Sequence, residues 1–433
     1  MAEPRRSIKV ANGKLEFRVP RSFRAGLAEV GKVVTDPPLL LWSAMLCLLP
    51  FYVVPSGLPQ PGDFLLILLA PIMLVRRRRA LTQDLAQPLR SLWIFVAWVV
   101  VLNFGWSLVT AEFSFNGRWG FLMAPTFYIY NAILFLTFLL MYAEYGYRLL
   151  WVTARVVLIS LLFQTTMSLL GPHGARDRLY FNNANQLGYY ALLCACVLLL
   201  NQRALKLSTL QVALGLLGAS FLTLTSGSRA ALGSIAMLAI ALVLTRFRTM
   251  LVAGAAVALL LLTPNPLSDA LQRAEDRIDR DESAVQFEER GYDRILAFPE
   301  YWGLGAGEGG YERFRNISKI GAHELHASMA TLFFCYGIVG VSLFAIFLWR
   351  VVRRSGVRTW LVVGPGFAYG MTHQGLRVAM LWVLLGMAVC LRNFARQERG
   401  PPKPSGQRTP TATGVPIKRR PAPTVGPLVG GAE

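Results

Sequence analysis

The chain has 433 residues, of which 54% are hydrophobic and only 16% are charged. An average soluble domain has roughly 25% charged residues, so the composition excludes a chain of ordinary soluble domains. The net charge of +20 does not by itself indicate nucleic acid binding. Arg and Lys cluster in short blocks between hydrophobic runs, as they do in membrane proteins with several spans.

Apolar runs follow one another along the chain, and each is long enough to cross ~30 Å of hydrocarbon as a helix. The stretch 149–170 is typical, because Arg155 is its only charged residue. We therefore predict an all-α transmembrane helix bundle with about 12 spans. The predicted spans are 38–56, 62–75, 91–109, 121–143, 148–170, 186–202, 208–225, 229–246, 249–264, 326–349, 359–373 and 376–394.

The basic residues also predict how the spans are oriented. If the polar and basic N-terminal segment is cytoplasmic, every even-numbered connection between spans carries Arg or Lys. This alternation is what the positive-inside rule requires, so we expect both termini to be cytoplasmic. The odd-numbered connections would then lie on the opposite side of the membrane.

One large charged loop interrupts the predicted spans and holds more than half of the acidic residues of the chain. Its segment 268–290 is expected to be helical and to cover the membrane face as a lid. The C-terminal tail is rich in Pro, Gly, Thr and basic residues, so it is expected to be disordered. The predicted parts are the basic segment 1–36, nine spans within 37–264, the loop 265–325, three spans within 326–394, and the tail 395–433.

Polar residues at the non-cytoplasmic border are the functional candidates, because such residues are costly near the membrane. The first group precedes the sixth predicted span and contains Arg178, Asn182, Asn183 and Asn185. Side-chain amides suit hydroxyl-rich ligands such as sugars, and an arginine can hold an anion. The alternative is that Asn183 or Asn185 only caps the following helix.

The second group is the tight turn 225–229 between the seventh and eighth predicted spans. Arg229 stands at the start of a helix, beside N–H groups that favour anions. It also breaks the charge rule for its side of the membrane. The alternative is an arginine that only reaches the membrane surface.

The third group runs from Arg290 and Arg294 through the glycine-rich stretch 303–310 to His323 and His326. Glycines permit tight turns and a close approach to a ligand. The two histidines are three residues apart at the predicted start of the tenth span, and the Glu between them is expected to point elsewhere. With no Cys or third His nearby, a general base is favoured over a metal ligand.

In these groups the sequence resembles the superfamily of O-antigen ligases and Wzy-type polysaccharide polymerases. The family signature is a His, a polar residue, nine others and a Gly-x-x-Gly. This chain departs from it at Ala327, where Asn, Ser or Gln is usual. The matching motifs are His326 with Gly337-Ile-Val-Gly340, Ser226-Gly-Ser-Arg229, Asn183-Ala-Asn185-Gln-Leu-Gly188, and Arg290 or Arg294 followed by Pro299 and Gly303-Leu-Gly305.

The resemblance implies a glycosyltransferase of the bacterial inner membrane with a GT-C-like fold, a large periplasmic loop, and neither metal nor cofactor. Its donor would be a glycan on undecaprenyl diphosphate. His326 would accept the proton of the attacking sugar hydroxyl, and arginines would stabilise the diphosphate. The implied diphosphate and glycan ligands are Arg229, Arg178, Arg290 or Arg294, Asn183, Asn185 and His323.

Three functions remain open at this stage. A polymerase would join lipid-linked repeat units, whereas a ligase would transfer the finished glycan to lipid A-core. Ala327 and the uncharged first outer loop favour the polymerase of an exopolysaccharide or O-antigen, with a flippase and a chain-length regulator as partners and no role for nucleic acid. A transporter or flippase of lipid-linked sugars is the rival outside the family, and it would require charged residues buried in mid-span.

Overall fold

The computed structural model describes residues 31, 33–55, 57–76, 79–111, 120–171, 176–243, 251, 292–314 and 324–399. These residues form helices and loops, with no β-strand among them. The described part of the chain is therefore all-α, as predicted. The segment 268–290 and nearly all of the N-terminal segment and the tail lie outside it.

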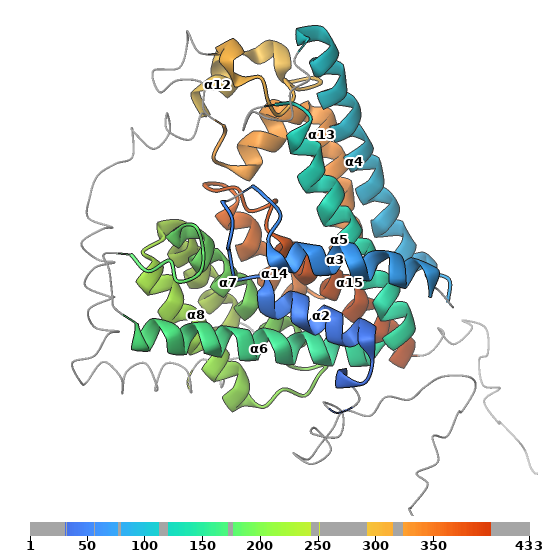
Figure 1. Ribbon diagram of the computed structural model, residues 1–433, viewed down its shortest axis with the longest axis vertical. Coiled ribbons are helices and arrows are strands. Elements are labelled where there is room, and N and C mark those ends of the chain that lie inside the picture. The colour runs from blue at the N-terminus through green and yellow to red at the C-terminus, as the bar shows by residue number, and fades with distance from the viewer. Residues whose placement is uncertain are drawn as a thin grey trace, which may run out of the picture. The chain divides into compact units, whose positions relative to one another are not determined.

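The helices follow the predicted spans closely (Figure 1). Every predicted span except 249–264 coincides with a described helix, and 249–264 lies almost entirely outside the described residues. The elements are α2 Pro37–Leu48, α3 Pro61–Val75, α4 Gln83–Thr110, α5 Met123–Tyr145, α6 Tyr147–Leu170, α7 Ala184–Asn201, α8 Thr209–Ser226, a helix Arg229–Val243, α12 Tyr292–Ala297, the short turns η1 Pro299–Tyr301 and η2 Tyr311–Phe314, α13 Ser328–Val352, α14 Val357–Tyr369 and α15 Ala379–Arg399.

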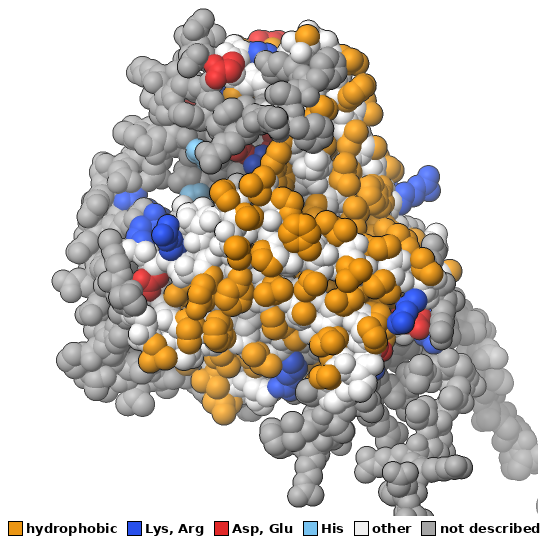
Figure 2. All heavy atoms as spheres, viewed as in Figure 1, with side chains coloured by type: hydrophobic (Ala, Val, Ile, Leu, Met, Phe, Trp, Pro, Cys, Tyr) orange, Lys and Arg blue, Asp and Glu red, His pale blue; other side chains and the backbone are white. Residues whose placement is uncertain are grey.

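Six of these helices, α4 to α8 and α13, are long and apolar enough to cross a membrane. The shorter apolar helices are α2, α3, Arg229–Val243 and 379–394. Figure 2 shows a face on which hydrophobic side chains form a nearly continuous surface, with charged side chains at its margins. Such a surface is typical of a protein whose helices face lipid. The number of about 12 spans stays a prediction.

Two predicted boundaries are wrong for identifiable reasons. The first span was expected to end at 56, but α2 ends at Leu48. Pro50 has no N–H to donate to the carbonyl of Leu46, four residues earlier, so the helical hydrogen bonding stops there. The N–H of Phe51 donates instead to the carbonyl of Leu48, at 3.0 Å. The third span was expected to begin at 91, but α4 already begins at Gln83 and contains Pro88.

Arg392, from the C-terminal part of the chain, contacts the first turns of α4. Pro88 has no N–H for the carbonyl of Asp84, four residues earlier. The guanidinium of Arg392 donates to that carbonyl instead, at 2.9 Å. Arg392 also donates to the carbonyls of Val351 and Arg353, at 3.0 and 3.2 Å. The apolar pattern of α4 alone could not reveal this contact.

The helices pack in two groups that meet along α5. In one group α4 packs against α5 and α13, and Figure 1 shows these three side by side. In the other group α6 packs against α2, α7 and α8. Helix α5 contacts both α3 and α6 and so connects the groups.

Helix α13 is broken at Gly337, whose φ of 64° and ψ of −174° are not helical. The break leaves the carbonyls before it without helical partners. The N–H groups of Ala306 and Gly307 donate to the carbonyls of Phe334 and Cys335, at 2.9 and 2.8 Å. The glycine-rich stretch therefore completes the hydrogen bonding of the broken helix.

This packing explains the glycines of both segments. A Cβ atom on Gly305, where φ is 105°, would lie 2.4 Å from the carbonyl oxygen of Cys335. One on Gly337 would lie 2.3 Å from the carbonyl oxygen of Gly303. The glycines of the stretch 303–310 were expected to permit a close approach to a ligand. At Gly305 the close approach is instead to the backbone of α13.

Candidate functional site

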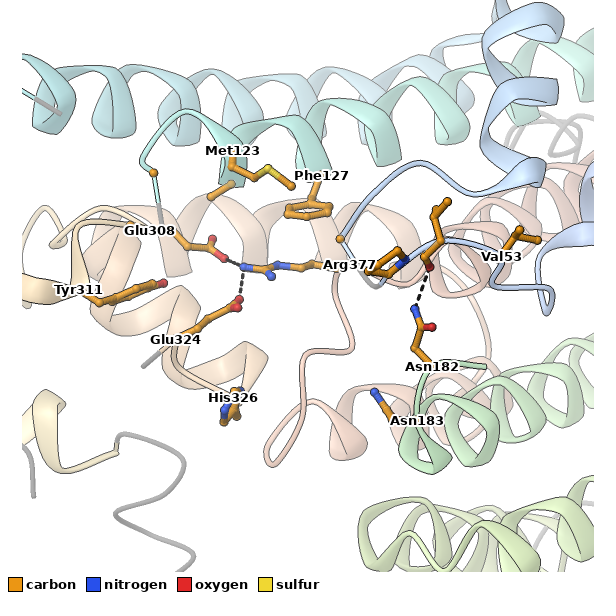
Figure 3. A pocket seen from close by; sticks show the side chains of 16 residues that line it. Val53, Met123, Phe127, Asn182, Asn183, Glu308, Tyr311, Glu324, His326 and Arg377 are labelled. Carbon is orange, nitrogen blue, oxygen red and sulfur yellow. Dashed lines mark hydrogen bonds and ion pairs between the residues drawn. The ribbon is translucent and has the colours of Figure 1, made fainter. Parts of the chain in front are cut away.

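A pocket of about 730 Å³ lies where the ends of several helices meet (Figure 3). We call it the Arg377 pocket. Its walls combine charged, amide and apolar side chains with exposed backbone, as ligand pockets commonly do. The lining residues are Val53, Val54, Pro55, Gly57, Gly120, Met123, Ala124, Phe127, Asn182, Asn183, Glu308, Gly309, Tyr311, Glu324, His326 and Arg377.

The lining residues come from one side of the predicted topology. They lie in the connections before α3, α5, α7, α13 and α15, and in the first turns of α5. The charge pattern assigns each of these connections to the non-cytoplasmic side. Segments far apart in sequence therefore meet as an alternating topology requires.

Arg377 is the centre of the charged part of the pocket. Its Nη2 atom forms ion pairs with Oε1 of Glu308 and Oε1 of Glu324, and Figure 3 shows the guanidinium between the two carboxylates. The guanidinium also lies 4.6 Å from the ring centre of Phe127. One cation thus holds two carboxylates that approach from different parts of the chain.

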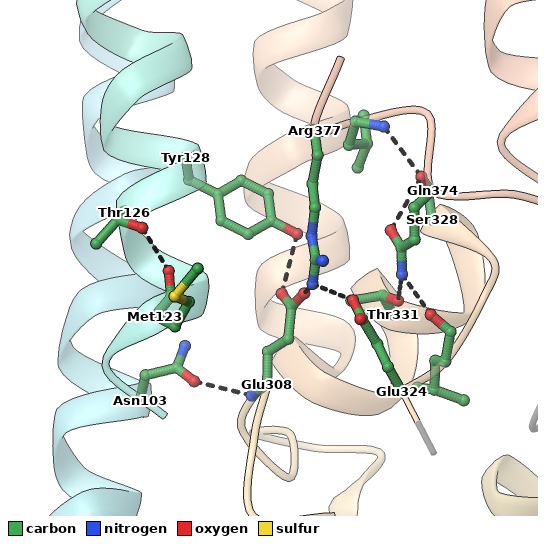
Figure 4. Close-up of polar contacts among 12 residues, drawn as sticks. Asn103, Met123, Thr126, Tyr128, Glu308, Glu324, Ser328, Thr331, Gln374 and Arg377 are labelled. Atoms are coloured by element: carbon green, nitrogen blue, oxygen red, sulfur yellow. Dashed lines mark hydrogen bonds and ion pairs between the residues drawn. The ribbon is translucent and has the colours of Figure 1, made fainter. Parts of the chain in front are cut away.

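Glu308 is the more deeply buried carboxylate, with 1% of its side chain exposed. Tyr128 also donates to it, at 3.2 Å (Figure 4). Tyr336 donates to the same carboxylate at 2.5 Å. The backbone N–H of Glu308 donates to the side-chain oxygen of Asn103 at 2.8 Å. Contacts of this kind provide hydrogen-bond partners for the oxygens of a buried carboxylate.

Glu324 and His326 lie on one wall of the pocket, in a stretch before α13 that is not helical and ends in Ala327 with extended backbone angles. In an extended segment alternate side chains point to the same side. Glu324 and His326 both line the pocket, whereas the intervening Leu325 and the following Ala327 are fully buried. The expectation that His326 begins a helix and that Glu324 points elsewhere is therefore wrong.

The connection between α14 and α15 fixes the start of α13. The carbonyls of His373 and Gly370 accept hydrogen bonds from the N–H groups of Ser328 and Met329, at 3.1 and 3.2 Å. The side chain of Gln374 donates to Thr331 at 2.7 Å and to the carbonyl of Leu325 (Figure 4). The segment that carries His326 is thereby attached to the connection that carries Arg377.

The pKa values of Glu324 and Arg377, which precede α13 and α15, change for different reasons. Burial raises the pKa of the Glu324 carboxyl, and Arg377 opposes that change. Burial alone would lower the pKa of Arg377, but Glu324 and Glu308 outweigh it and raise that pKa. Arg377 therefore stays cationic at any physiological pH.

The asparagines of the first predicted group have different roles. Asn183 caps α7 by accepting from the N–H of Gln186 at 2.9 Å, so the expected capping contact is present. It also lines the Arg377 pocket. Asn185 instead accepts from Arg176 at 2.7 Å, and Arg176 donates to the carbonyl of Ser226 at 2.9 Å. The first and second predicted groups are therefore in contact.

Arg178 and Arg229 differ in accessibility. Arg178 is exposed and lines a second pocket of about 340 Å³, which shares Val53 and Asn182 with the Arg377 pocket. We call it the Arg178 pocket. Arg229 begins the helix Arg229–Val243, as predicted, but it is half-buried and lines neither pocket.

Arg294 is 3% exposed and lines neither pocket. Its guanidinium lies 5.6 Å from the ring centre of Tyr311, and burial lowers its pKa. In this arrangement Arg294 supports the wall residue Tyr311. Arg290 and His323 lie outside the described residues, so their predicted roles stay predictions.

Sequence reasoning missed Glu308 and Arg377 as members of the site. Arg377 lies at the start of the last predicted span, 376–394, at the border where arginine is disfavoured, so the rule that singled out Arg229 also applies to it. Glu308 had no such signal, because its position within a glycine-rich stretch suggests a turn. Its partners Tyr128 and Tyr336 lie in other helices.

No protein-family model and no curated protein matches the sequence. Function must therefore be argued from the chemistry of the two pockets. The Arg377 pocket offers an exposed imidazole, a partly exposed carboxylate and side-chain amides, and the Arg178 pocket offers an exposed cation beside aromatic side chains. This arrangement suits a proton acceptor next to hydroxyl groups, with an anion nearby.

Proposed function

We propose that the chain is a glycosyltransferase that polymerises undecaprenyl-diphosphate-linked oligosaccharide repeat units at the periplasmic face of the bacterial inner membrane. The proposal includes about 12 spans, cytoplasmic termini and a largely periplasmic loop 265–325. One observation carries it. His326 is exposed in the Arg377 pocket, and that pocket shares two wall residues with the pocket that contains Arg178.

In the proposed reaction a hydroxyl oxygen of the acceptor sugar attacks the anomeric carbon of the donor. His326 takes the hydroxyl proton, and the bond between that carbon and the diphosphate oxygen breaks. Undecaprenyl diphosphate leaves with the bonding electrons, and attack from the opposite face inverts the anomeric carbon. Of the two arginines that line these pockets, Arg178 is the exposed one, and it would stabilise the charge of the leaving group.

The first outer connection supports the preference for a polymerase over a ligase. Gln60 closes this loop by accepting from Val53 at 3.0 Å and donating to the carbonyls of Val54 and Leu58, each at 3.0 Å. The closed and uncharged loop forms one wall of the Arg377 pocket. Such a wall suits a sugar chain better than a phosphorylated lipid A-core acceptor.

The test is the glycan content of a deletion strain, resolved by length and by carrier lipid. A polymerase predicts that long chains disappear and that single lipid-linked repeat units remain. Complementation with the wild-type chain should restore long chains, and His326→Ala should not. Full-length polymer retained on undecaprenyl diphosphate would instead identify a ligase.

A further inference from the structure

The Arg377 pocket contains an arginine, yet it carries no net positive charge. With both carboxylates ionised, Arg377, Glu308 and Glu324 sum to a charge of −1, and with Glu324 protonated they sum to zero. His326 must be neutral to accept a proton. A diphosphate in this pocket would therefore lose its hydration without meeting an uncompensated cation.

The geometry of Arg377 leads to the same conclusion. Both carboxylates bind its Nη2 atom, and its guanidinium covers the ring of Phe127. A phosphate would have to displace a carboxylate to gain a bidentate contact. The His326 ring, the Asn183 side chain and the partly exposed Glu324 carboxylate also line this pocket. Hydrogen-bond donors and acceptors of this kind match neutral hydroxyl groups.

The neighbouring Arg178 pocket has the opposite character. Arg178 is exposed, and no carboxylate is among the described residues that line this pocket. Tyr180 and Phe163 are exposed at 39% and 42%, and their rings stack with centres 6.5 Å apart. An exposed cation beside an apolar surface fits a prenyl diphosphate.

We infer that the two pockets divide the substrates, with the neutral, hydroxyl-rich acceptor sugar in the Arg377 pocket and the lipid diphosphate of the donor in the Arg178 pocket. This inference rests on the proposed function. The shared wall of Val53 and Asn182 would bring the two reacting groups together. The carboxylates around Arg377 then serve to keep the diphosphate out of the acceptor pocket.

The test is equilibrium binding of two probes to the full chain in lipid nanodiscs. The probes are farnesyl diphosphate and the repeat-unit oligosaccharide obtained by partial hydrolysis of the polysaccharide of the host strain. Arg178→Gln should weaken binding of farnesyl diphosphate about 10-fold or more and change oligosaccharide binding less than about 2-fold. Met123→Trp, which fills the Arg377 pocket without changing charge, should do the reverse.

Arg377→Gln provides the sharpest contrast with Arg178→Gln. It should leave binding of farnesyl diphosphate within about 2-fold of wild type, because its charge is already compensated. The inference would be overturned if Arg377→Gln or Met123→Trp weakened the binding of farnesyl diphosphate as much as Arg178→Gln does. Failure of the wild-type chain to bind the oligosaccharide would also overturn it.

The same experiment separates this inference from the proposed function. One outcome is that the oligosaccharide binds in the Arg377 pocket while farnesyl diphosphate binds no better than farnesol. In that case the assignment of the acceptor sugar to the Arg377 pocket is retained. The lipid-diphosphate donor of the proposed function would then be wrong. If both probes bind as expected and deletion strains still make long chains, only the polymerase assignment fails.

Discussion

The two ends of the helices use arginine in opposite ways. At the end with the basic connections, Arg392 donates to backbone carbonyls, including those of Asp84 and Val351. At the pocket end, Arg377 forms ion pairs with Glu308 and Glu324. Arginines near helix C-termini complete the hydrogen bonding of the fold. An arginine that instead compensates carboxylates in a pocket sets the charge that a ligand meets.

This difference separates residues that stabilise the fold from residues that shape the site. A change at the Arg392 end should lower stability and leave the reaction almost unchanged. A change at the pocket end should alter the reaction, the charge of the pocket, or both. The following variants test that separation, from the largest expected effect to the smallest.

His326→Ala should lower transfer about 10²- to 10⁴-fold, because the reaction would lose its proton acceptor. The measurement is the amount and length of polymer in a complemented deletion strain. His373→Asn is the matched control, because the backbone carbonyl of His373 that accepts from Ser328 is retained. Unchanged polymer in His326→Ala would remove this residue from the mechanism.

Arg377→Met should cost about 3–5 kcal/mol of stability, because it leaves Glu308 buried without its cation. Thermal unfolding in detergent would measure this as a lower Tm. The double variant Arg377→Met with Glu308→Gln should recover part of the loss. A double variant that is less stable than Arg377→Met alone would show that charge compensation is not the reason.

Gly305→Ala should cost about 2–4 kcal/mol, because its positive φ and the nearby Cys335 carbonyl leave no room for a Cβ atom. Gly303→Ala is the matched control, since a Cβ atom there meets nothing within 4 Å. The comparison is again the Tm of the two variants. Equal Tm values would contradict the packing of the glycine-rich stretch against the break in α13.

Arg392→Met should cost about 1–3 kcal/mol, because several backbone carbonyls lose their donor. Transfer per folded molecule should stay within about 2-fold of wild type, because Arg392 lies far from the pocket chemistry. The exposed Arg203 provides the control, and Arg203→Met should change stability by less than about 0.5 kcal/mol. A loss of transfer without a loss of stability in Arg392→Met would contradict the view that this end of the helices only stabilises the fold.

The smallest expected effect is a pH dependence at Glu324. Its pKa is raised in the folded chain by burial, so folding favours the protonated form. The stability of the wild type relative to Glu324→Gln should be greatest at low pH and should fall as pH rises through the raised pKa. Tm values of the two chains from about pH 4 to about pH 8 would measure it. A difference that grows with pH would have the wrong sign.

The sequence predicted the positions of the helices better than their ends. Apolar runs mark where a helix can face lipid, so most predicted spans coincide with helices. In the first turns of α4, the carbonyl of Asp84 accepts a hydrogen bond from Arg392, which is more than 300 positions away along the chain. A local pattern cannot contain such a contact.

The candidate site was predicted only in part, again for a physical reason. His326, Arg178 and Asn183 are polar residues at predicted borders, and all of them line a pocket. Glu308 and Arg377 belong to the site because of the charges that they bring to each other. The extended backbone before α13, which places Glu324 beside His326, has no signature in the sequence.

Reconstitution tests the proposed reaction most directly. The purified chain in liposomes would be supplied with lipid-linked repeat units in the presence of a metal chelator, and the products would be separated by length. We predict a ladder of longer lipid-linked glycans from the wild type and only single repeat units from His326→Ala. Single units left unchanged by the wild type, or an equal ladder from His326→Ala, would contradict the proposed polymerase.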